Sequence, residues 1–496
     1  MYYVLGRRLS FGDRQEMGCR VMHAHTRLFF VEKILRIQPN VKKMFVLIRA
    51  ADKQLAARRL HEELIQKKLF DILREEWAEK FNSIVEKLFP IPGDVCCENL
   101  GVHDFDLRSE LWREIDVIVN SAATTKFDER YDIALAVNAF GAKNVAEFAG
   151  RCADIKMLLH VSTAYICGDM TGIIRERAIY MGETLNGSRV LDVNEEKLLV
   201  EELMIELREK DASERELTIA LKNLGLQRAR LHGWPNTYTL TKAMGEMMLW
   251  HHLNHNIPLA IIRPTIITST YREPFAGWIE DSSFRTIDSI AINYGRGRLK
   301  CFLGNPDTIL DTLPADMVVN AMIVAIAVHA NQPNSNKIYQ VGSSRKHPLT
   351  YSDITDITWS YFKDSPWINE NGEPVKVHKL RIVKSMASFH KHLRHYILLT
   401  KVLKVASSIF GGRLQGLHAD VHKKVNAAVR LAELYEPYAL FKGIFDDTNT
   451  EALRAITSNN GVNLESVFYF DPRCINWEDY FKRIHFPGVV NAFNRK

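Results

Sequence analysis

The sequence predicts an α/β protein built on a doubly wound parallel sheet, followed by a smaller and mainly helical C-terminal domain. Short apolar runs alternate with helical segments over most of the chain, as expected when helices cover both faces of a parallel sheet. From about residue 360 the helical pattern continues without this alternation. A third observation is the stretch W-P-N-T-Y-T-L-T-K, which lies between two of the apolar runs.

The predicted strands are continuous apolar runs, which are typical of strands buried on both faces. They cover residues 43–49, 115–120, 156–165, 258–264 and 338–342, and Pro92-Gly93-Asp94 closes a further strand-like segment. Helical spacing is expected at 29–37, 51–89, 132–152 and around 238–250, and a long helix begins at Leu313-Pro314. The order of these elements predicts βαβ units.

Composition excludes several classes of protein. The chain has 496 residues, 46% hydrophobic and 25% charged, which is usual for a globular protein of two or three domains. A net charge of +6 is too small over this length to indicate a nucleic-acid partner. The seven cysteines are scattered and form no C-x-x-C pair, so neither a disulfide framework nor a zinc site is expected. No run reaches the roughly 18 apolar residues of a membrane span.

Tyr238 and Lys242 are the first candidates for a catalytic pair. Four residues apart, they share one face of a helix. An ammonium group one turn away favours the phenolate, so we expect it to lower the pKa of Tyr238 from about 10 toward neutral pH. The same ammonium could hold a ribose hydroxyl of a nucleotide. Alone, the Y-x-x-x-K pattern is more typical of a solvated lysine beside a half-buried tyrosine than of a catalytic pair.

The neighbouring strands favour the catalytic interpretation. Upstream, the run at 156–165 ends in the hydroxyls of Ser162 and Thr163, and a second run follows at 258–264. This order, a strand, then the helix with Tyr238 and Lys242, then a second strand, is similar to the layout of a short-chain dehydrogenase. In that family such a hydroxyl and the tyrosine both bind a substrate carbonyl oxygen. We assign this role to Thr163, with Ser162 as its weaker neighbour. The alternative is that both hydroxyls only satisfy backbone groups at a strand end.

Two further segments stand out. The charged helical hairpin at about 187–231 falls between Thr163 and Tyr238, and we interpret it as an insertion or lid over the site. Between Pro374 and Arg413 there are nine Lys or Arg, four His and no Asp or Glu, interleaved with Leu, Ile and Val. Such a stretch is typical of a solvated face, of contact with an anionic membrane or of contact with a CoA phosphate. The histidines have no carboxylate or cysteine beside them, so no metal site is predicted.

Several motifs together resemble the plant alcohol-forming fatty acyl-CoA reductases, an extended short-chain dehydrogenase family. These motifs are F-V-E-K-I-L-R-I-Q-P-N-V-K-K, A-A-T-T-K-F-D-E-R-Y-D, H-V-S-T-A-Y-I-C-G, Y-T-L-T-K-A and L-P-A-D-M-V-V-N-A-M. The late F-Y-F-D-P-R-C-I-N-W-E-D-Y resembles the second, "male-sterility" domain of that family. The match runs from about residue 29 to the end.

The resemblance implies a Rossmann-like fold and reduction of a long-chain acyl-CoA, through an aldehyde, to a primary alcohol, with NADPH as cofactor. It puts Tyr238, Lys242 and Thr163 at the catalytic positions, with Lys242 also on the cofactor ribose.

The remaining implied residues bind the cofactor. Arg49, after the second strand, would hold the 2′-phosphate of NADPH. Asp94 would face the adenine, Ala122 and Ala123 would line the cofactor, and Pro264 would lie beside the nicotinamide.

The N-terminus departs from the family pattern. The family has a first strand and a Gly-rich turn, T-G-A-T-G-F-L-A, directly before its F-V-E-K-I-L-R. The corresponding residues here, 20–27, contain no Gly, and the preceding 15–19 are not an apolar run. Since Gly lets backbone amides reach a pyrophosphate, we expect the first strand and the Gly-rich turn to be missing and activity to be impaired.

The predicted domains are an atypical segment at 1–28, an NADP-binding reductase domain at 29–358 and a C-terminal domain at 359–496. The predicted function is NADPH-dependent reduction of acyl-CoA in lipid biosynthesis, as a peripheral protein on the cytoplasmic face of the endoplasmic reticulum or, alternatively, in the plastid. The alternatives are a non-catalytic acyl-CoA or lipid-binding relative, a truncated or mis-spliced gene product, and a nucleotide-sugar epimerase or dehydrogenase. The long insertion and the helical second domain disfavour the last.

Overall fold

A parallel sheet forms the centre of the molecule. The structure is a computed structural model, and it describes residues 2–5, 24–38, 40–187, 190–280, 286–330, 332, 335–409, 415–459 and 467–495. Among these residues, seven strands pair side by side, and every pair is parallel. In spatial order they are β11 (Lys337–Val341), β7 (Leu259–Pro264), β5 (Met157–Val161), β4 (Val117–Asn120), β1 (Tyr2–Leu5), β2 (Met44–Ile48) and β3 (Leu88–Pro92).

Strand β1 corrects one prediction. Tyr2–Leu5 pairs with β2 on one side and with β4 on the other, with Tyr2 opposite both Met44 and Val117. The expectation that the first strand is missing is therefore wrong. The family pattern places this strand directly before the first helix, whereas Y-Y-V-L lies much earlier in the chain and is too short to show a period. The Gly-rich turn was predicted to be absent from residues 20–27. Of these, the structure describes only 24–27, which begin α1, because residues 6–23 lie outside the described part.

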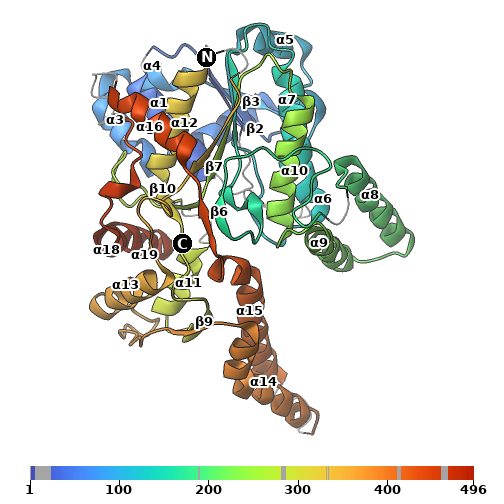
Figure 1. Cartoon of the computed structure of the whole chain (residues 1–496), viewed down its shortest axis with the longest axis vertical. Coiled ribbons are helices and arrows are strands. Elements are labelled where there is room, and N and C mark those ends of the chain that lie inside the picture. Colours follow the sequence, from blue (N-terminus) through green and yellow to red (C-terminus); the bar gives the residue numbers. More distant parts are fainter. Residues whose placement is uncertain are drawn as a thin grey trace.

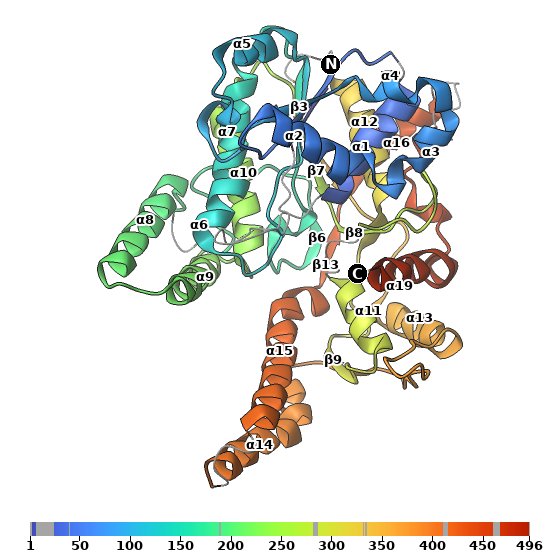
Figure 2. The same ribbon diagram turned by 180° about the vertical axis from the view of Figure 1, so that it is seen from behind.

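Helices cover both faces of the sheet (Figures 1 and 2). One face carries α1 (Ala24–Ile37), α2 (Lys53–Leu60), α3 (Asp71–Glu76), α4 (Phe81–Val85), α12 (Ala315–His329) and α16 (Thr448–Asn459). The other carries α5 (Phe105–Glu114), α7 (Gly141–Ala149) and α10 (Thr237–His252). This is the doubly wound arrangement predicted from the alternating pattern.

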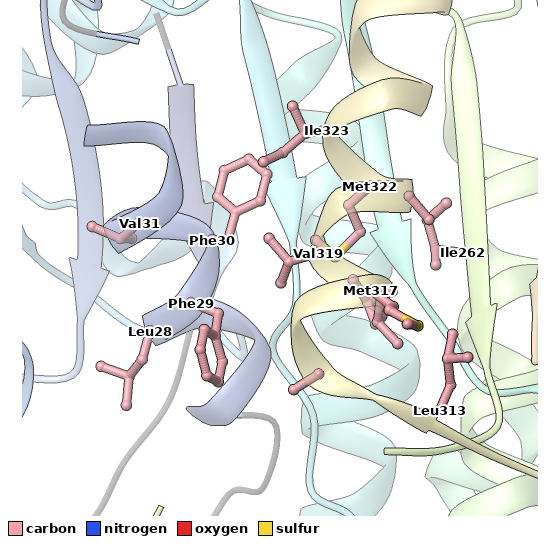
Figure 3. Packing of buried hydrophobic residues seen from close by; sticks show 14 of the residues in the cluster. Leu28, Phe29, Phe30, Val31, Ile262, Leu313, Met317, Val319, Met322 and Ile323 are labelled. Atoms are coloured by element: carbon pink, nitrogen blue, oxygen red, sulfur yellow. The ribbon is translucent and has the colours of Figure 1, made fainter. Parts of the chain in front are cut away.

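The core between α1 and α12 shows why these helices pack there. Figure 3 shows Phe30 of α1 beside Val319 and Ile323 of α12, with Met322 between α12 and Ile262 of β7. Phe30, Val319 and Met322 are each at most 1% exposed. Burial of such large apolar side chains stabilises the fold by about 1.5–3 kcal/mol each.

The insertion between β5 and α10 is a helical hairpin, as its charged helical pattern predicted, but none of its described residues lines the cavity at the site, so the expected lid over the site is not seen. It consists of α8 (Val193–Glu209) and α9 (Glu214–Leu231). With α6 (Tyr131–Ala134) it packs on the outer side of α10. Its buried Glu196, on α8, accepts a hydrogen bond from Tyr131 of α6, which joins the hairpin to the body, and another from Arg228 of α9, which joins its two helices.

The C-terminal part is mainly helical and makes contact with the sheet domain at several places. It contains α13 (Tyr351–Asp364), α14 (Met386–Ile409), α15 (Gln415–Ala439), α18 (Trp477–Asp479) and α19 (Phe486–Asn494), and α11 (Ile287–Gly295) lies beside it. Three two-stranded parallel sheets complete the fold: β8 (Ile266–Thr268) with β10 (Thr312–Pro314), β9 (Cys301–Leu303) with β12 (Arg381–Val383), and β6 (Gly172–Ile174) with β13 (Gly443–Phe445). Helices α14 and α15 project from the body as a long hairpin (Figures 1 and 2).

Candidate functional site

The carboxyl ends of β4, β5 and β7 meet at one edge of the sheet, where ligands bind in open parallel sheets. Asn120 ends β4, and the predicted Ala122 and Ala123 follow it. Ser162 and Thr163 follow β5 directly, and Pro264 ends β7. The structure therefore brings together, at one edge, residues that are far apart in the sequence.

An apolar cavity of about 550 Å³ opens at this edge. Ser162, Thr163, Tyr238 and Pro264 line one end of it. The rest of its wall is mostly aliphatic and aromatic, with contributions from Ile266, Ile267, Ile279, Ile287, Ile290, Ala291, Tyr294, Phe302, Leu310, Tyr351, Ile354, Leu380, Leu431, Leu434, Tyr435, Tyr438, Ala439 and Phe486. A cavity of this composition fits a long hydrocarbon chain whose polar end lies at the hydroxyls.

Tyr238 lies in the first turn of α10, which Asn236 caps by accepting a hydrogen bond from the Thr239 amide. The tyrosine is 6% exposed, and its phenol hydrogen-bonds with the Thr163 side chain. Burial raises the pKa of Tyr238 above its ordinary value, against the opposing effect of that hydrogen bond. The structure thus differs from the expected lowering, because desolvation of the phenolate is the larger effect here.

Lys242 lies one turn further along α10 and is completely buried. Its Nζ donates to the main-chain oxygen of Val161 at 2.8 Å and lies 3.2 Å from Nε2 of His160. Burial lowers the pKa of Lys242 to about 8, and the carboxylate of Glu246 partly opposes this.

A hydrogen-bond chain continues from His160 to the loop after β4. The Asn120 amide oxygen accepts from the Ala122 N–H at 3.2 Å, which turns the amide nitrogen toward Nδ1 of His160 at 3.1 Å. Burial and the neighbouring Lys242 hold the pKa of His160 well below its usual value, so the ring is neutral.

The two hydroxyls at the end of β5 differ in their surroundings. Thr163 caps a short 3₁₀ turn, where its Oγ1 accepts from the Tyr165 amide at 3.3 Å. The Ser162 hydroxyl is buried and has no hydrogen-bond partner within the described part of the chain. Since an unsatisfied buried hydroxyl is costly, Ser162 is a donor available to a bound polar group.

A nicotinamide cofactor fits the same edge at two places. Pro264 and Tyr238 line the end of the cavity where the ring would lie, and Lys242 follows Tyr238 by one turn of α10. Arg49 follows β2, and its guanidinium pairs with Asp94 at 3.2 Å, so the two residues predicted for the adenosine half are in contact. Arg27 and Arg59 line the same small recess as Arg49, which makes it basic. The segment between β1 and α1, where a diphosphate would be expected, lies outside the described residues.

Sequence reasoning missed His160 and Asn120, which contact the predicted residues. A signal was present in each case, because both are polar side chains within apolar runs, M-L-L-H-V and I-D-V-I-V-N. It also missed Phe127 and Tyr438, whose rings stack at 4.9 Å beside Tyr238, and nothing in the local pattern indicated this contact.

Two searches of the described residues gave negative results. No group of three or more His, Cys, Asp or Glu side chains is arranged to hold a metal ion among them. Within the same residues, no helix has the length and apolar character that crossing a membrane requires.

Comparison with known families gives two matches. Residues 28–322 match a family of NAD-binding domains described as "Male sterility protein", and residues 395–495 match a second family with the same description.

Several curated proteins are similar to this chain over nearly its whole length. The probable fatty acyl-CoA reductase 4 of Arabidopsis thaliana is 48% identical over 471 residues, which cover 94% of this chain and 95% of the relative. The alcohol-forming fatty acyl-CoA reductase of Simmondsia chinensis is 48% identical over 464 residues, 93% of each protein. Fatty acyl-CoA reductase 1 of Arabidopsis thaliana is 47% identical over 463 residues, again 93% of each.

Solved structures resemble the fold at much lower identity. The terminal R domain of the myxalamid PKS-NRPS biosynthetic pathway superposes with a TM-score of 0.55 at 15% identity, covering 100% of this chain and 90% of that domain. The reductase domain of a nonribosomal peptide synthetase from Mycobacterium tuberculosis gives 0.53 at 15% identity, covering 100% and 91%. At this identity the likeness is one of fold.

Proposed function

Because this chain belongs to the fatty acyl-CoA reductase family of male sterility proteins, we propose that it reduces a long-chain acyl-CoA, through an aldehyde, to a primary alcohol with NADPH. The observation that carries this proposal is the apolar cavity that ends at the buried hydroxyls of Tyr238 and Thr163. A chain of methylenes gains about 0.8 kcal/mol for each one buried, so such a cavity favours long acyl groups.

The residues at the end of the cavity bind and protonate the carbonyl oxygen. Bound NADPH would supply a hydride to the thioester carbonyl carbon, after which the C–S bond breaks and CoA leaves as its thiol, and a second NADPH would supply the hydride that reduces the aldehyde. Tyr238 and Thr163 donate hydrogen bonds to the oxygen, which stabilises the negative charge that develops there. Because burial raises the pKa of Tyr238, the phenol keeps its proton at neutral pH and serves as the acid. Ser162 offers a third donor.

Lys242 supports the tyrosine from one turn away. We propose that its amine moves from Val161 and His160 toward the ribose and Tyr238 when the cofactor binds, and that it stabilises the phenolate that forms after proton donation. Because Tyr238, Lys242 and Thr163 are all present, an enzyme is favoured over a non-catalytic lipid-binding relative.

We propose NADPH rather than NADH because of the charges around Arg49. Arg27, Arg49 and Arg59 carry three positive charges around one recess. Glu63, paired with Arg59, and Asp94, paired with Arg49, contribute two negative charges, so positive charge remains in excess. An NADP-binding site needs a cation for the 2′-phosphate, whereas an NAD-binding site has an acidic residue for the ribose hydroxyl.

The test is reduction of stearoyl-CoA by the protein and by Tyr238→Phe. The parent should oxidise NADPH and form stearyl alcohol, identified by gas chromatography. The variant should lose about 10²–10⁴ in rate, because the ring packs equally well while the acid is gone. Tyr180→Phe is the matched control, since Tyr180 is exposed and outside the cavity, and it should retain the parent rate. A Tyr238→Phe rate within about threefold of the parent would contradict the assignment.

A second proposal concerns peripheral contact with an anionic membrane through the predicted stretch 374–413. On α14, Tyr396, Leu398, Leu399, Val402 and Val405 expose between 42% and 59% of their surface. Lys391, Arg394, Lys401 and Lys404 are exposed on the same helix. Exposed apolar side chains flanked by cations are typical of helices that lie in a bilayer interface. We propose the cytoplasmic face of the endoplasmic reticulum as the site, with the plastid as the alternative.

A further inference from the structure

The last two turns of α15 form one wall of the cavity. Leu431, Leu434, Tyr435, Tyr438 and Ala439 line it, and their spacing of three and four residues places them on one face of the helix. This helix belongs to residues 395–495, which match a family separate from the NAD-binding match at 28–322. The cavity is therefore built from both parts of the chain.

The end of α15 is attached to the catalytic helix. Phe127, in the loop after β4, has its ring centroid 4.9 Å from that of Tyr438 and 6.1 Å from that of Tyr238. The Asn236 amide donates to the Tyr438 hydroxyl at 2.8 Å, and Asn236 is also the residue that caps α10. A displacement of α15 would therefore disturb the helix that carries Tyr238.

One turn earlier, Tyr435 is held in a defined orientation. Its hydroxyl accepts from the Thr286 amide at 2.7 Å, at the start of α11. Its ring lies 5.7 Å from Phe127 and 6.4 Å from Phe302, measured between centroids. Tyr435 thus spans from the catalytic end of the cavity to the part lined by Phe302.

Leu431 continues the wall away from Tyr238. It packs with Phe302 and Tyr351 in one hydrophobic cluster, which also includes Ala439 and Tyr435. Arg430, the residue before Leu431, forms an ion pair at 2.9 Å with Asp128, which follows Phe127 and itself lines the cavity. The apolar contacts and this ion pair together fix the position of the wall relative to the site.

We propose that the C-terminal domain completes the acyl-binding site and that Leu431, Leu434 and Tyr435 determine how long an acyl chain fits. This inference rests on the proposed function, because it places the acyl group in the cavity with its carbonyl at Tyr238. A chain that extends from Tyr238 along α15 meets these side chains in turn. Each methylene that the cavity can no longer hold should reduce affinity about fourfold.

Three variants test the proposal with lauroyl-, palmitoyl-, stearoyl- and lignoceroyl-CoA. Leu434→Trp and the milder Leu434→Phe reduce the cavity and should lower kcat/KM for the long thioesters at least about tenfold relative to lauroyl-CoA. Leu431→Ala enlarges it and should shift the preference toward lignoceroyl-CoA. Glu433→Ala is the matched control, because Glu433 lies on the same turn but does not line the cavity. Thermal melting identifies variants that fail to fold.

Displacement of cis-parinaric acid by the same thioesters measures binding without turnover. Parent-like chain preference in both assays, in folded Leu434→Phe and Leu431→Ala, overturns the inference. If the parent reduces none of the thioesters but the variants shift the order of displacement as expected, the proposed reduction fails and the wall assigned to α15 stands. A shift in both assays supports both proposals.

Discussion

At the scale of single residues, Lys242 is a charged side chain in the interior. Burial lowers its pKa from 10.5 to about 8, so the folded protein binds the proton less tightly than the unfolded chain does. Burial of the charged amine therefore destabilises the folded protein. The full cost applies below about pH 8, where the lysine is charged in both states, and it disappears as pH rises from about 8 to about 10.5. The shift between these two pKa values lowers the free energy of unfolding by about 3 kcal/mol at most.

Lys242→Met should accordingly raise the melting temperature at pH 7 and abolish reduction. The gain should shrink toward pH 10, because the parent then loses its buried charge. Loss of the hydrogen bonds to Val161 and His160 makes the net gain smaller, by about 1 kcal/mol for each bond. Lys197→Met, on the exposed side of α8, should show no such dependence on pH. A variant less stable than the parent by the same amount from pH 7 to pH 10 would rule out a buried ammonium.

Arg49 permits a prediction about cofactor preference. Arg49→Glu should shift the ratio of NADPH to NADH affinity toward NADH, because a carboxylate repels the 2′-phosphate and accepts from a ribose hydroxyl. Titration calorimetry with both cofactors measures the ratio. Lys53→Glu is the matched control, since Lys53 is an exposed cation just after the same strand, and it should leave the ratio unchanged. An unchanged ratio in Arg49→Glu means that Arg49 does not bind the phosphate.

At the scale of elements, the connection between β1 and α1 is where the family pattern expects the cofactor diphosphate. The chain contains Gly6, Gly12 and Gly18 between them, but no G-x-x-G spacing, and 24–27 are A-H-T-R. In the family pattern, backbone amides of a Gly-rich turn hold the diphosphate at a helix N-terminus. A side chain in place of each glycine of such a turn would keep the backbone away from the ligand.

A chimera tests this element. Its strand Tyr2–Leu5 is kept, and residues 6–27 are replaced by T-G-A-T-G-F-L-A. We expect the chimera to bind NADPH at least about a hundredfold more tightly, because charge-assisted hydrogen bonds contribute about 1.5–3 kcal/mol each and two or more would be restored. Calorimetric titration of both proteins provides the comparison. Equal affinity would mean that the natural connection already holds the diphosphate, and that the expectation of impaired activity is mistaken.

At the scale of the whole molecule, α15 connects two surfaces. Its C-terminal turns line the cavity, and its remaining length packs against α14 in the projecting hairpin (Figure 2). If the hairpin lies on a bilayer, the acyl cavity is held close to the membrane in which long-chain substrates and products dissolve. The proposed membrane contact and the position of the cavity are therefore compatible with one orientation, in which the hairpin of α14 and α15 faces the bilayer.

Removal of the cations on α14 should weaken binding to anionic vesicles. With Lys391, Arg394, Lys401 and Lys404 changed to Gln, partition should fall by up to about 10³-fold, since each cation contributes about 1 kcal/mol near such a surface. Co-sedimentation with phosphatidylserine vesicles measures it, and added salt should weaken the parent similarly. The matched control changes four exposed cations elsewhere, namely Lys53, Lys197, Lys210 and Arg177. Equal sedimentation of both variants and the parent leaves α14 as a solvated helix.

Local patterns in the sequence were enough to predict the class of fold and to single out Tyr238 and Lys242 as a candidate pair. Apolar runs at 43–49, 156–165 and 258–264 predicted β2, β5 and β7, because a strand buried on both faces must be apolar throughout. The i, i+4 spacing placed Tyr238 and Lys242 on one helix face, since helical geometry is local. These are properties of neighbours along the chain.

Only the tertiary structure decided what lies between distant segments. It placed β1 in the middle of the sheet, His160 against Lys242, and Tyr438 of α15 beside the loop that contacts Tyr238. Tyr238 and Tyr438 are 200 residues apart, and no period or spacing links them. Such contacts depend on which apolar faces are left to cover one another after the local elements have formed, and that is settled by packing of the whole chain.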